Sequence, residues 1–168
     1  MNVKRLPMNV LKKLDELVAA TTRSIGEHCN RFGEVSEHLV AFNIAKRFNE
    51  LGYHFVGVAR GGFEILENDQ VVTEIDILLE DEKTIAIVEV NSKPTLQDIK
   101  KHLKLMSIAR KHYDKLGRTN KALIGAVAGA VFPDKVKKFT IETGFYVITQ
   151  SGNTVKIEVP ENFKPKIL

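Results

Sequence analysis

The chain has 168 residues, of which 43% are hydrophobic and 27% charged, and its net charge is +4. This length and composition are typical of one globular domain with a full core. No apolar run reaches the roughly 18 residues of a membrane span, and charged residues interrupt the N-terminal segment where a signal peptide would lie. The lone Cys29 forms no internal disulfide. A cytoplasmic protein without a membrane segment is therefore expected.

The first predicted helix spans about residues 6–25, where apolar residues recur near one face. A helix of this length is marginal alone, so its apolar stripe needs a partner surface. Packing on its own domain and a homodimer contact both remain open. A break at His28–Gly33 then predicts an N-terminal helical extension at 1–30 and one domain at 31–168.

A second helix is predicted at about 34–51, because apolar residues follow its core stripe and Gly52 suits a helix C-terminus. Residues 53–59 are then typical of a strand, and 60–63 of a loop. Arg60 in that loop is a candidate contact to a nucleic-acid backbone, although a solvated arginine explains it as well.

Two strands with carboxylates inside them are predicted next, at 71–79 and 84–91, joined by a short acidic turn. The first alternates polar and apolar residues with a period of two, and the second is rich in β-branched residues. Asp76 lies within the first strand and Glu89 within the second. Because a buried carboxylate is normally paired or bound to a metal, Asp76 and Glu89 are candidates to share a divalent cation.

A long amphipathic helix follows Pro94, with Thr95 as its expected N-cap. From Lys93 to Lys121 the local charge is +7, although the whole chain carries only +4. This concentration predicts a nucleic-acid-binding surface, or else a solvated lysine-rich face. Its candidate contacts are Lys100, Lys101 and Lys104. His102 and His112 are expected at the surface of the same helix.

The remaining segments predict a strand at 122–132 covered on both faces, a short helix at 133–143 and a final hairpin from 145–149 and 154–159. The tail from Pro160 is expected to be loosely packed.

The segment E-I-D-I, then a hairpin, then I-V-E-V-N-S-K, resembles the PD-(D/E)XK nuclease superfamily, which includes restriction endonucleases and Holliday-junction resolvases. The family pattern places an Asp on one strand and (D/E)-x-K on the next. Asp76 and Glu89 match the acidic positions, and Asn91 stands where the family carries its Lys. The resemblance covers about residues 34–149 and implies a restriction-endonuclease-like α/β fold, with an αβββαβ core and a mixed sheet flanked by helices.

The resemblance also implies a chemistry, which is hydrolysis of DNA with Mg²⁺ or Mn²⁺. The ion would be held by Asp76, Glu89 and the backbone carbonyl of Val90. A carboxylate from the first core helix would lie nearby, with Glu37 as the first choice and Glu34 as the second, unless these acids only favour the helix dipole.

Lys93 is the candidate to replace the missing lysine, because it follows Asn91 at about 6 to 7 Å along the same face if the strand continues. Two other classes of function stay open. One is a non-catalytic module that binds nucleic acid or protein. The other is a structural dimer in which Lys93 forms an ion pair with Asp76 and Glu89.

Overall fold

The structure is a computed structural model that describes residues 43–168, apart from 69 and 153 and the side chains of 60 and 61. The predicted N-terminal extension and its boundary, the possible dimer contact, and both Glu34 and Glu37 lie outside the described residues. The described part begins with a helical segment at 43–50. It continues in the order β1 (Gly57–Glu67), β2 (Gln70–Glu80), β3 (Thr84–Asn91), α2 (Leu96–Lys115), β4 (Ala122–Gly129), α3 (Asp134–Glu142), β5 (Tyr146–Ser151) and β6 (Thr154–Glu158).

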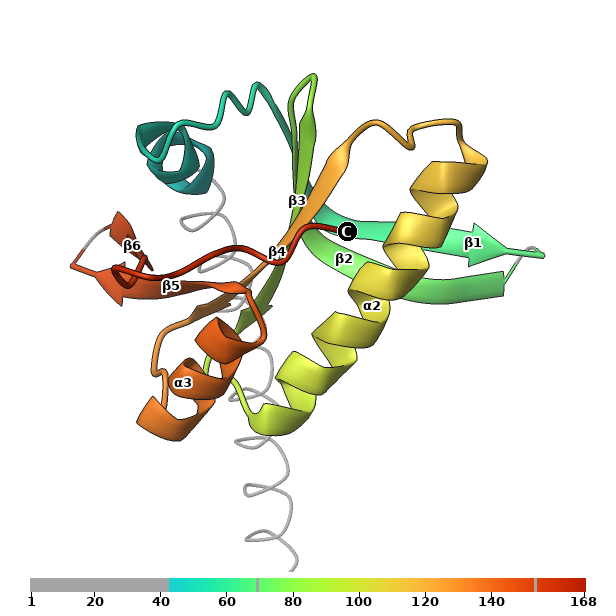
Figure 1. The fold of residues 1–168 in the computed structure, drawn as a ribbon. Helices are drawn as coiled ribbons and strands as arrows, with labels where there is room; N and C mark the ends of the chain where they lie inside the picture. Colours follow the sequence, from blue (N-terminus) through green and yellow to red (C-terminus); the bar gives the residue numbers. More distant parts are fainter. Residues whose placement is uncertain (1–42, 69, 153) are drawn as a thin grey trace, which may run out of the picture. The chain divides into compact units, whose positions relative to one another are not determined.

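The six strands form one mixed sheet in which each strand lies beside its neighbours in the chain (Figure 1). β3, β4 and β5 are parallel to one another, and the other pairs are antiparallel. Parallel neighbours need a crossover connection, and α2 and α3 provide the two crossovers. The predicted α/β fold, with a mixed central sheet flanked by helices, is therefore confirmed.

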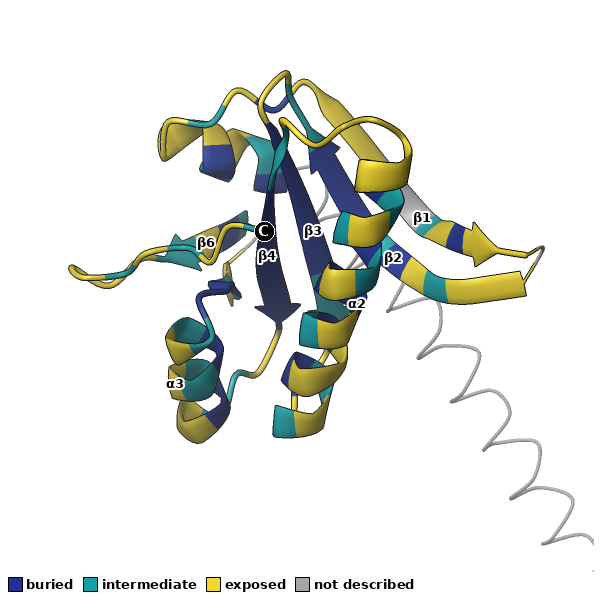
Figure 2. Ribbon diagram, turned by 45° about the vertical axis from the view of Figure 1, so that its right-hand side comes forward, coloured by how far each residue is buried: buried dark blue, intermediate teal, exposed yellow. Residues whose placement is uncertain are grey.

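The core occupies both faces of the sheet, because β3 and β4 are buried on each side (Figure 2). On one face, Phe48 of the helical segment packs in a cluster with Ile77 of β2. On the other face, Met106 of α2 packs in a cluster with Ile87 of β3. The predicted central strand at 122–132 is thus β4, which ends at Gly129. No helix in the described part of the chain is long and apolar enough to cross a membrane.

The prediction of a strand at 53–59 and a loop at 60–63 is wrong, because β1 begins at Gly57 and continues through the glycines. The side chain of Asn49 explains the later start. Its Oδ1 accepts a hydrogen bond from the backbone N of Phe55 at 2.8 Å, and its Nδ2 donates to the carbonyl of Phe55 at 3.2 Å. The backbone of Phe55 therefore has partners in the preceding helix and needs no neighbouring strand.

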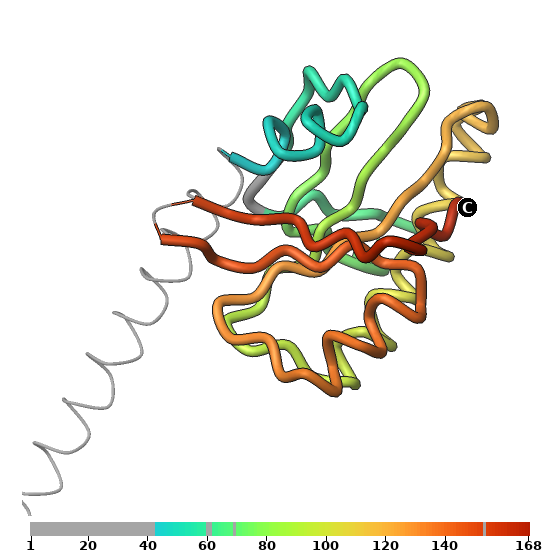
Figure 3. Tube along the Cα trace, turned by 60° about the vertical axis from the view of Figure 1, so that its left-hand side comes forward, coloured from blue at the N-terminus to red at the C-terminus, as the bar shows by residue number. Residues whose placement is uncertain are grey.

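The C-terminal tail is also bound more firmly than its composition predicted. It returns from β6 to the start of β4 (Figure 3), where Leu168 and Leu123 exchange two backbone hydrogen bonds of 3.0 Å. The Lys166 N donates to the carbonyl of Gly144 on the way. The tail thus pairs with the first part of β4.

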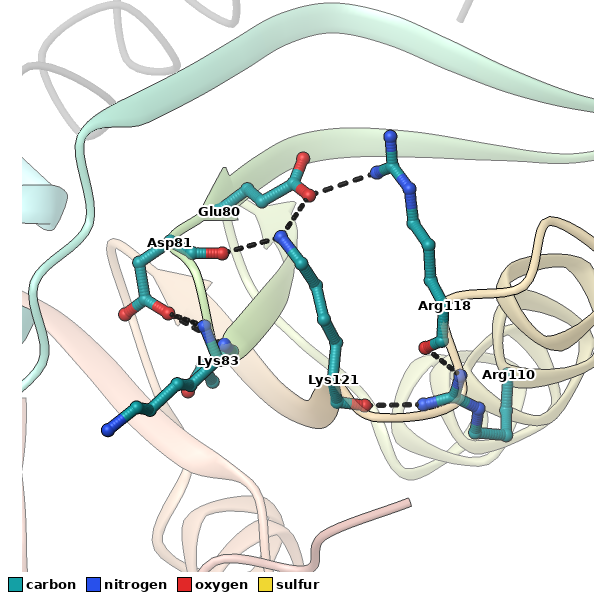
Figure 4. A network of polar contacts seen from close by, with 7 residues as sticks. Glu80, Asp81, Lys83, Arg110, Arg118 and Lys121 are labelled. Atoms are coloured by element: carbon teal, nitrogen blue, oxygen red, sulfur yellow. Dashed lines mark hydrogen bonds and ion pairs between the residues drawn. The ribbon is translucent and has the colours of Figure 1, made fainter.

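A polar network fixes the end of the sheet where β3 and β4 begin (Figure 4). Oε1 of Glu80 lies 2.6 Å from Nζ of Lys121 and 2.9 Å from Nη1 of Arg118. Arg110 donates to the carbonyls of Lys121 and Arg118 at 2.7 and 2.9 Å. These ion pairs and hydrogen bonds hold this end of the sheet together, whereas the opposite end of β3 contains the candidate site.

Candidate functional site

Asp76 and Glu89 come together where the pairing between β2 and β3 stops. The last paired residues are Ile77 and Val88, so the next antiparallel positions are Asp76 and Glu89. Oδ2 of Asp76 accepts a hydrogen bond from the backbone N of Val90 at 2.7 Å. The carboxylate thus takes a donor from β3 just beyond the ladder, and the two strands hold both acidic side chains at one point. The structure thus brings Asp76 and Glu89 to neighbouring positions, and their shared cation and their role as metal ligands stay predictions.

A β-bulge in β1 lies directly opposite Asp76. The register between β1 and β2 shifts between Arg60 and Phe63, so the two glycines there stand against Asp76. Gly62 has a φ of +84°, and a Cβ at this position would collide with Oε1 of Glu74. A bulge strengthens the local twist and redirects side chains of the neighbouring strand. The glycine pair therefore allows Glu74 to lie close to the bulge.

β2 turns over at Asp76 as a result of this twist. Ile75 packs in the core cluster under α2, whereas Ile77, two residues later, packs in the cluster on the opposite face of the sheet. In a regular strand both side chains would point to the same face. Asp76 lies at the crossing point, half-buried between the two clusters.

The electrostatics of the pair are dominated by burial and by like charges. Burial, followed by the charges of Asp76 and Asp98, raises the pKa of Glu89 to about 7, and Lys101 opposes this rise. Burial, together with the charge of Glu74, also raises the pKa of Asp76, although its hydrogen bond from Val90 opposes the shift. The carboxylates repel one another, and within the described residues no Lys or Arg forms an ion pair with either of them. A bound cation would relieve this repulsion.

The donor set fits a hard divalent cation, since such ions prefer carboxylate oxygens. In the described residues, no group of three or more His, Cys, Asp or Glu side chains is arranged to hold a metal. Two carboxylates, Asp76 and Glu89, are present, and the fit therefore depends on further oxygen ligands such as a backbone carbonyl, water or phosphate. The predicted carbonyl ligand belongs to Val90, whose N–H is bound to Asp76.

Asn91 and Lys93, the two residues considered for the lysine position, differ in their placement. Asn91 is the last residue of β3, and its Nδ2 donates to Oε1 of Glu89 at 3.4 Å. Lys93 follows the end of β3 in a bend and is exposed. The condition that the strand continues to Lys93 is not met, because Pro94 cannot extend the ladder. Among the described residues no ion pair joins Lys93 to Asp76 or Glu89, so the proposed structural ion pair is wrong.

One face of α2 brings three residues toward Glu89 instead. Asp98 and Lys101 both act on its charge, and Nδ1 of His102 lies 4.0 Å from its Oε2. Positions 98, 101 and 102 are three and four residues apart, so they share a helix face. Lys101 was predicted only as a contact to nucleic acid, whereas its charge also acts on Glu89.

His102 was predicted at the surface, and this prediction is wrong because its side chain is fully buried. The sequence did contain the signal. His102 lies three residues after Ile99 and four before Met106, on the apolar stripe of the helix, and all three are buried. The prediction instead followed from the basic character of the helix on which His102 lies.

The N-terminal part of α2 is fixed as expected, with its lysines facing solvent. Thr95 and Asp98 form a capping box, in which each side chain accepts from the other's backbone N–H. Lys100, Lys101 and Lys104 are exposed. Four later cations of the same basic segment are instead engaged in ion pairs, namely Arg110 with Asp114, Lys115 with Glu67, and Arg118 and Lys121 with Glu80. Arg60 belongs to β1, and its contact to nucleic acid stays a prediction.

Comparison with known proteins gives likeness of fold only. No protein-family model and no curated protein matches the chain. A repair endonuclease from Pyrococcus abyssi is similar at 14% identity and a TM-score of 0.45, over 64% of this chain and 43% of that one. The EndoMS–dsDNA complex is similar at 13% identity and a TM-score of 0.39, over 67% of this chain and 45% of that one. The chain thus spans less than half the length of these solved proteins, and no residue role is transferred from them.

Proposed function

We propose that this chain is a nuclease that hydrolyses phosphodiester bonds of DNA with the help of Mg²⁺ or Mn²⁺. The observation that carries the proposal is the Asp76–Glu89 pair at the end of the β2–β3 ladder. Both carboxylates are half-buried, and neither forms an ion pair with a Lys or Arg in the part of the chain that the structure describes. The exposed lysines of α2 follow directly in the chain and would bind the phosphates of the substrate. The motif that resembles the PD-(D/E)XK superfamily supports the same function.

Each residue would have a distinct part in the reaction. Asp76 and Glu89 would hold the cation, together with the carbonyl of Val90. When bound, such an ion lowers the pKa of a water ligand and polarises the phosphate. Asn91 is placed to orient Glu89, to which its amide donates. A water oxygen adds to phosphorus, the bond from phosphorus to one sugar oxygen breaks, and a proton passes to the leaving oxygen.

A positive charge near the attacked phosphate is the function that Asn91 cannot supply. Lys101 is better placed for it than Lys93, because its charge acts on Glu89 while Lys93 lies past the end of β3. We therefore assign Lys101 two parts, contact with DNA and stabilisation of charge that develops on the phosphate. Glu37 remains the proposed helix carboxylate, with Glu34 as its alternative.

The test is cleavage of plasmid and single-stranded DNA with Mg²⁺ or Mn²⁺, beside Asp76→Ala and Asn91→Lys. We expect the unsubstituted chain to cleave and Asp76→Ala to lose activity by at least about a hundredfold, because one of two carboxylate ligands is removed. Activity in Asn91→Lys alone would show an intact metal site that lacks one charge.

A second candidate is a module that binds nucleic acid without cleaving it, and the uncharged Asn91 favours it. Salt-dependent DNA binding with no cleavage by any of the three proteins would support this function and contradict the nuclease. Both candidate functions use the exposed lysines of α2 to bind nucleic acid. They differ in whether Asp76 and Glu89 support cleavage.

A further inference from the structure

His102 is a buried polar side chain whose contacts do not explain its presence. Its side chain is fully buried, and neither ring nitrogen makes a well-formed hydrogen bond in the described part of the chain. An unsatisfied buried polar group costs about 1 to 3 kcal/mol. Burial lowers the pKa of His102 to about 4, although a weak backbone hydrogen bond with Ile87 opposes the shift, so the ring is neutral near pH 7. A neutral ring carries one proton, for which the backbone of Ile87 and the Glu89 carboxylate are the two neighbouring acceptors.

The core accommodates the His102 ring because a neighbouring residue, Gly125, has no side chain. The ring of Phe145 packs edge-on against His102 at a centroid distance of 4.9 Å. Gly125 of β4 lies beneath both, and a Cβ there would overlap the Phe145 ring at 2.6 Å and lie 3.4 Å from Nε2 of His102. The absence of a side chain at Gly125 therefore leaves the space that the rings of His102 and Phe145 occupy.

The opposite side of the ring faces Glu89. Nδ1 of His102 lies 4.0 Å from Oε2 of that carboxylate, about 1 Å beyond an ordinary hydrogen bond. The other oxygen, Oε1, accepts from the amide of Asn91 at 3.4 Å. The Glu89 carboxylate is thus flanked by one donor from β3 and one from α2, and a small movement of its side chain would bring Oε2 within reach of His102.

We propose that His102 is a positioning residue that donates its Nδ1–H to Oε2 of Glu89 and so fixes the carboxylate for a divalent cation. This inference rests on the proposed function and adds a residue that the motif does not contain. A donor behind a ligating carboxylate restricts its rotation and favours one orientation of the free lone pairs. The rigid packing against Phe145 and Gly125 is what makes the donor precise.

The alternative is that His102 only fills space in the core. The two roles differ in a quantity that does not depend on activity, namely the affinity for Mn²⁺ alone, measured by isothermal titration calorimetry on the full chain. His102→Leu removes the donor and keeps an apolar side chain. His102→Asn keeps a donor close to the position of Nδ1. Met106→Leu changes another fully buried side chain one turn later in α2 and serves as the matched control.

We expect His102→Leu to bind Mn²⁺ about tenfold more weakly or worse, while His102→Asn and Met106→Leu stay within about threefold of the unsubstituted chain. Thermal unfolding without metal separates folding from positioning, because His102→Leu removes two unsatisfied nitrogens and should unfold no earlier than the unsubstituted chain. If it does not fold, His102→Phe replaces it in the same comparison.

Mn²⁺ affinity of His102→Leu equal to that of the unsubstituted chain would overturn the inference and leave the proposed nuclease intact. Equal losses in His102→Leu and His102→Asn would also overturn it, because the donor would then be irrelevant. Absence of Mn²⁺ binding in the unsubstituted chain would instead overturn the metal site itself, and the inference with it.

Discussion

Replacing Glu89 by Gln should stabilise the metal-free protein at pH 8. The pKa of Glu89 rises from its ordinary value of 4.5 to about 7 in the folded chain, because of burial and then the charges of Asp76 and Asp98. Folding therefore favours the protonated form. The contribution of Glu89 to the free energy of unfolding is fully present below pH 4.5 and is lost as the pH rises through 7. Gln is uncharged at every pH and avoids this loss.

The magnitude follows from the difference between the two pKa values. Each pH unit between them is worth about 1.4 kcal/mol, so the upper limit is about 3 kcal/mol. The Glu89 side chain is 26% exposed, and solvent screening reduces the expected gain to about 2 kcal/mol. At pH 4.5 the difference between Glu89→Gln and the unsubstituted chain should almost vanish, because the native carboxyl is then protonated.

The assay is urea unfolding in EDTA, followed by circular dichroism because the chain contains no Trp, at several pH values from 4.5 to 8. Glu80→Gln is a matched control, since Glu80 is also a sheet glutamate and its side chain is 29% exposed. Its ion pairs to Arg118 and Lys121 give the opposite sign, a loss of about 1 kcal/mol near neutral pH. A Glu89→Gln protein that is less stable than the unsubstituted chain at pH 8, or a gain that does not depend on pH, would refute the reasoning.

Two further predictions concern the lysines. Lys101→Ala should lower kcat for DNA cleavage by about tenfold or more, whereas Lys93→Ala should leave kcat within about threefold of the unsubstituted chain, because Lys101 and not Lys93 acts on the charge of Glu89. The measurement is the single-turnover cleavage rate, and equal effects of the two substitutions would contradict this assignment. Exchange of Lys100 and Lys104 for Gln should weaken DNA binding and reduce the slope of log affinity against log salt by up to about 2, since each exposed lysine neutralises about one phosphate. Lys115→Gln is the control, because Lys115 is already paired with Glu67. An equal reduction of the slope by Lys115→Gln would contradict DNA binding by Lys100 and Lys104.

The sequence predicted those parts of the fold that depend on local patterns. β3 begins and ends at the predicted residues because its β-branched run is bounded by a turn and by Pro94. Thr95 caps α2 as predicted, since a cap needs only a few neighbouring residues. The expectation that Asp76 and Glu89 lie close together rested on two neighbouring strands that each contain a carboxylate. The register of β2 and β3 brings the two residues to the positions after the last pair, Ile77 and Val88.

The errors arose where distant residues decide the structure. Gly61 and Gly62 are typical of a loop, but the pairing of β1 with β2 accommodates them as a bulge. His102 was assigned to the surface because histidine is polar, although the space beside Gly125 receives its ring. Lys93 was expected to share a face with Glu89, but β3 ends two residues earlier. The glycines and His102 depend on contacts with another element, whereas the place of Lys93 is set by the bend before Pro94.

Ion pairs explain why the N-terminal part of the basic segment, residues 93–121, is the part more available to bind an anion. Its C-terminal cations are held by carboxylates of β1, β2 and α2 itself, and these pairs contribute to the closed end of the sheet. Its N-terminal lysines have no such partners among the described ion pairs and lie in the chain directly after Asp76 and Glu89. The charge of Lys101 thus acts on Glu89, yet among the residues that the structure describes no side-chain ion pair joins these lysines to Asp76 or Glu89. A divalent ion and a phosphate bound together would neutralise both sets at once, and for this reason the proposed site is better suited to a metal–phosphate pair than to either ligand alone.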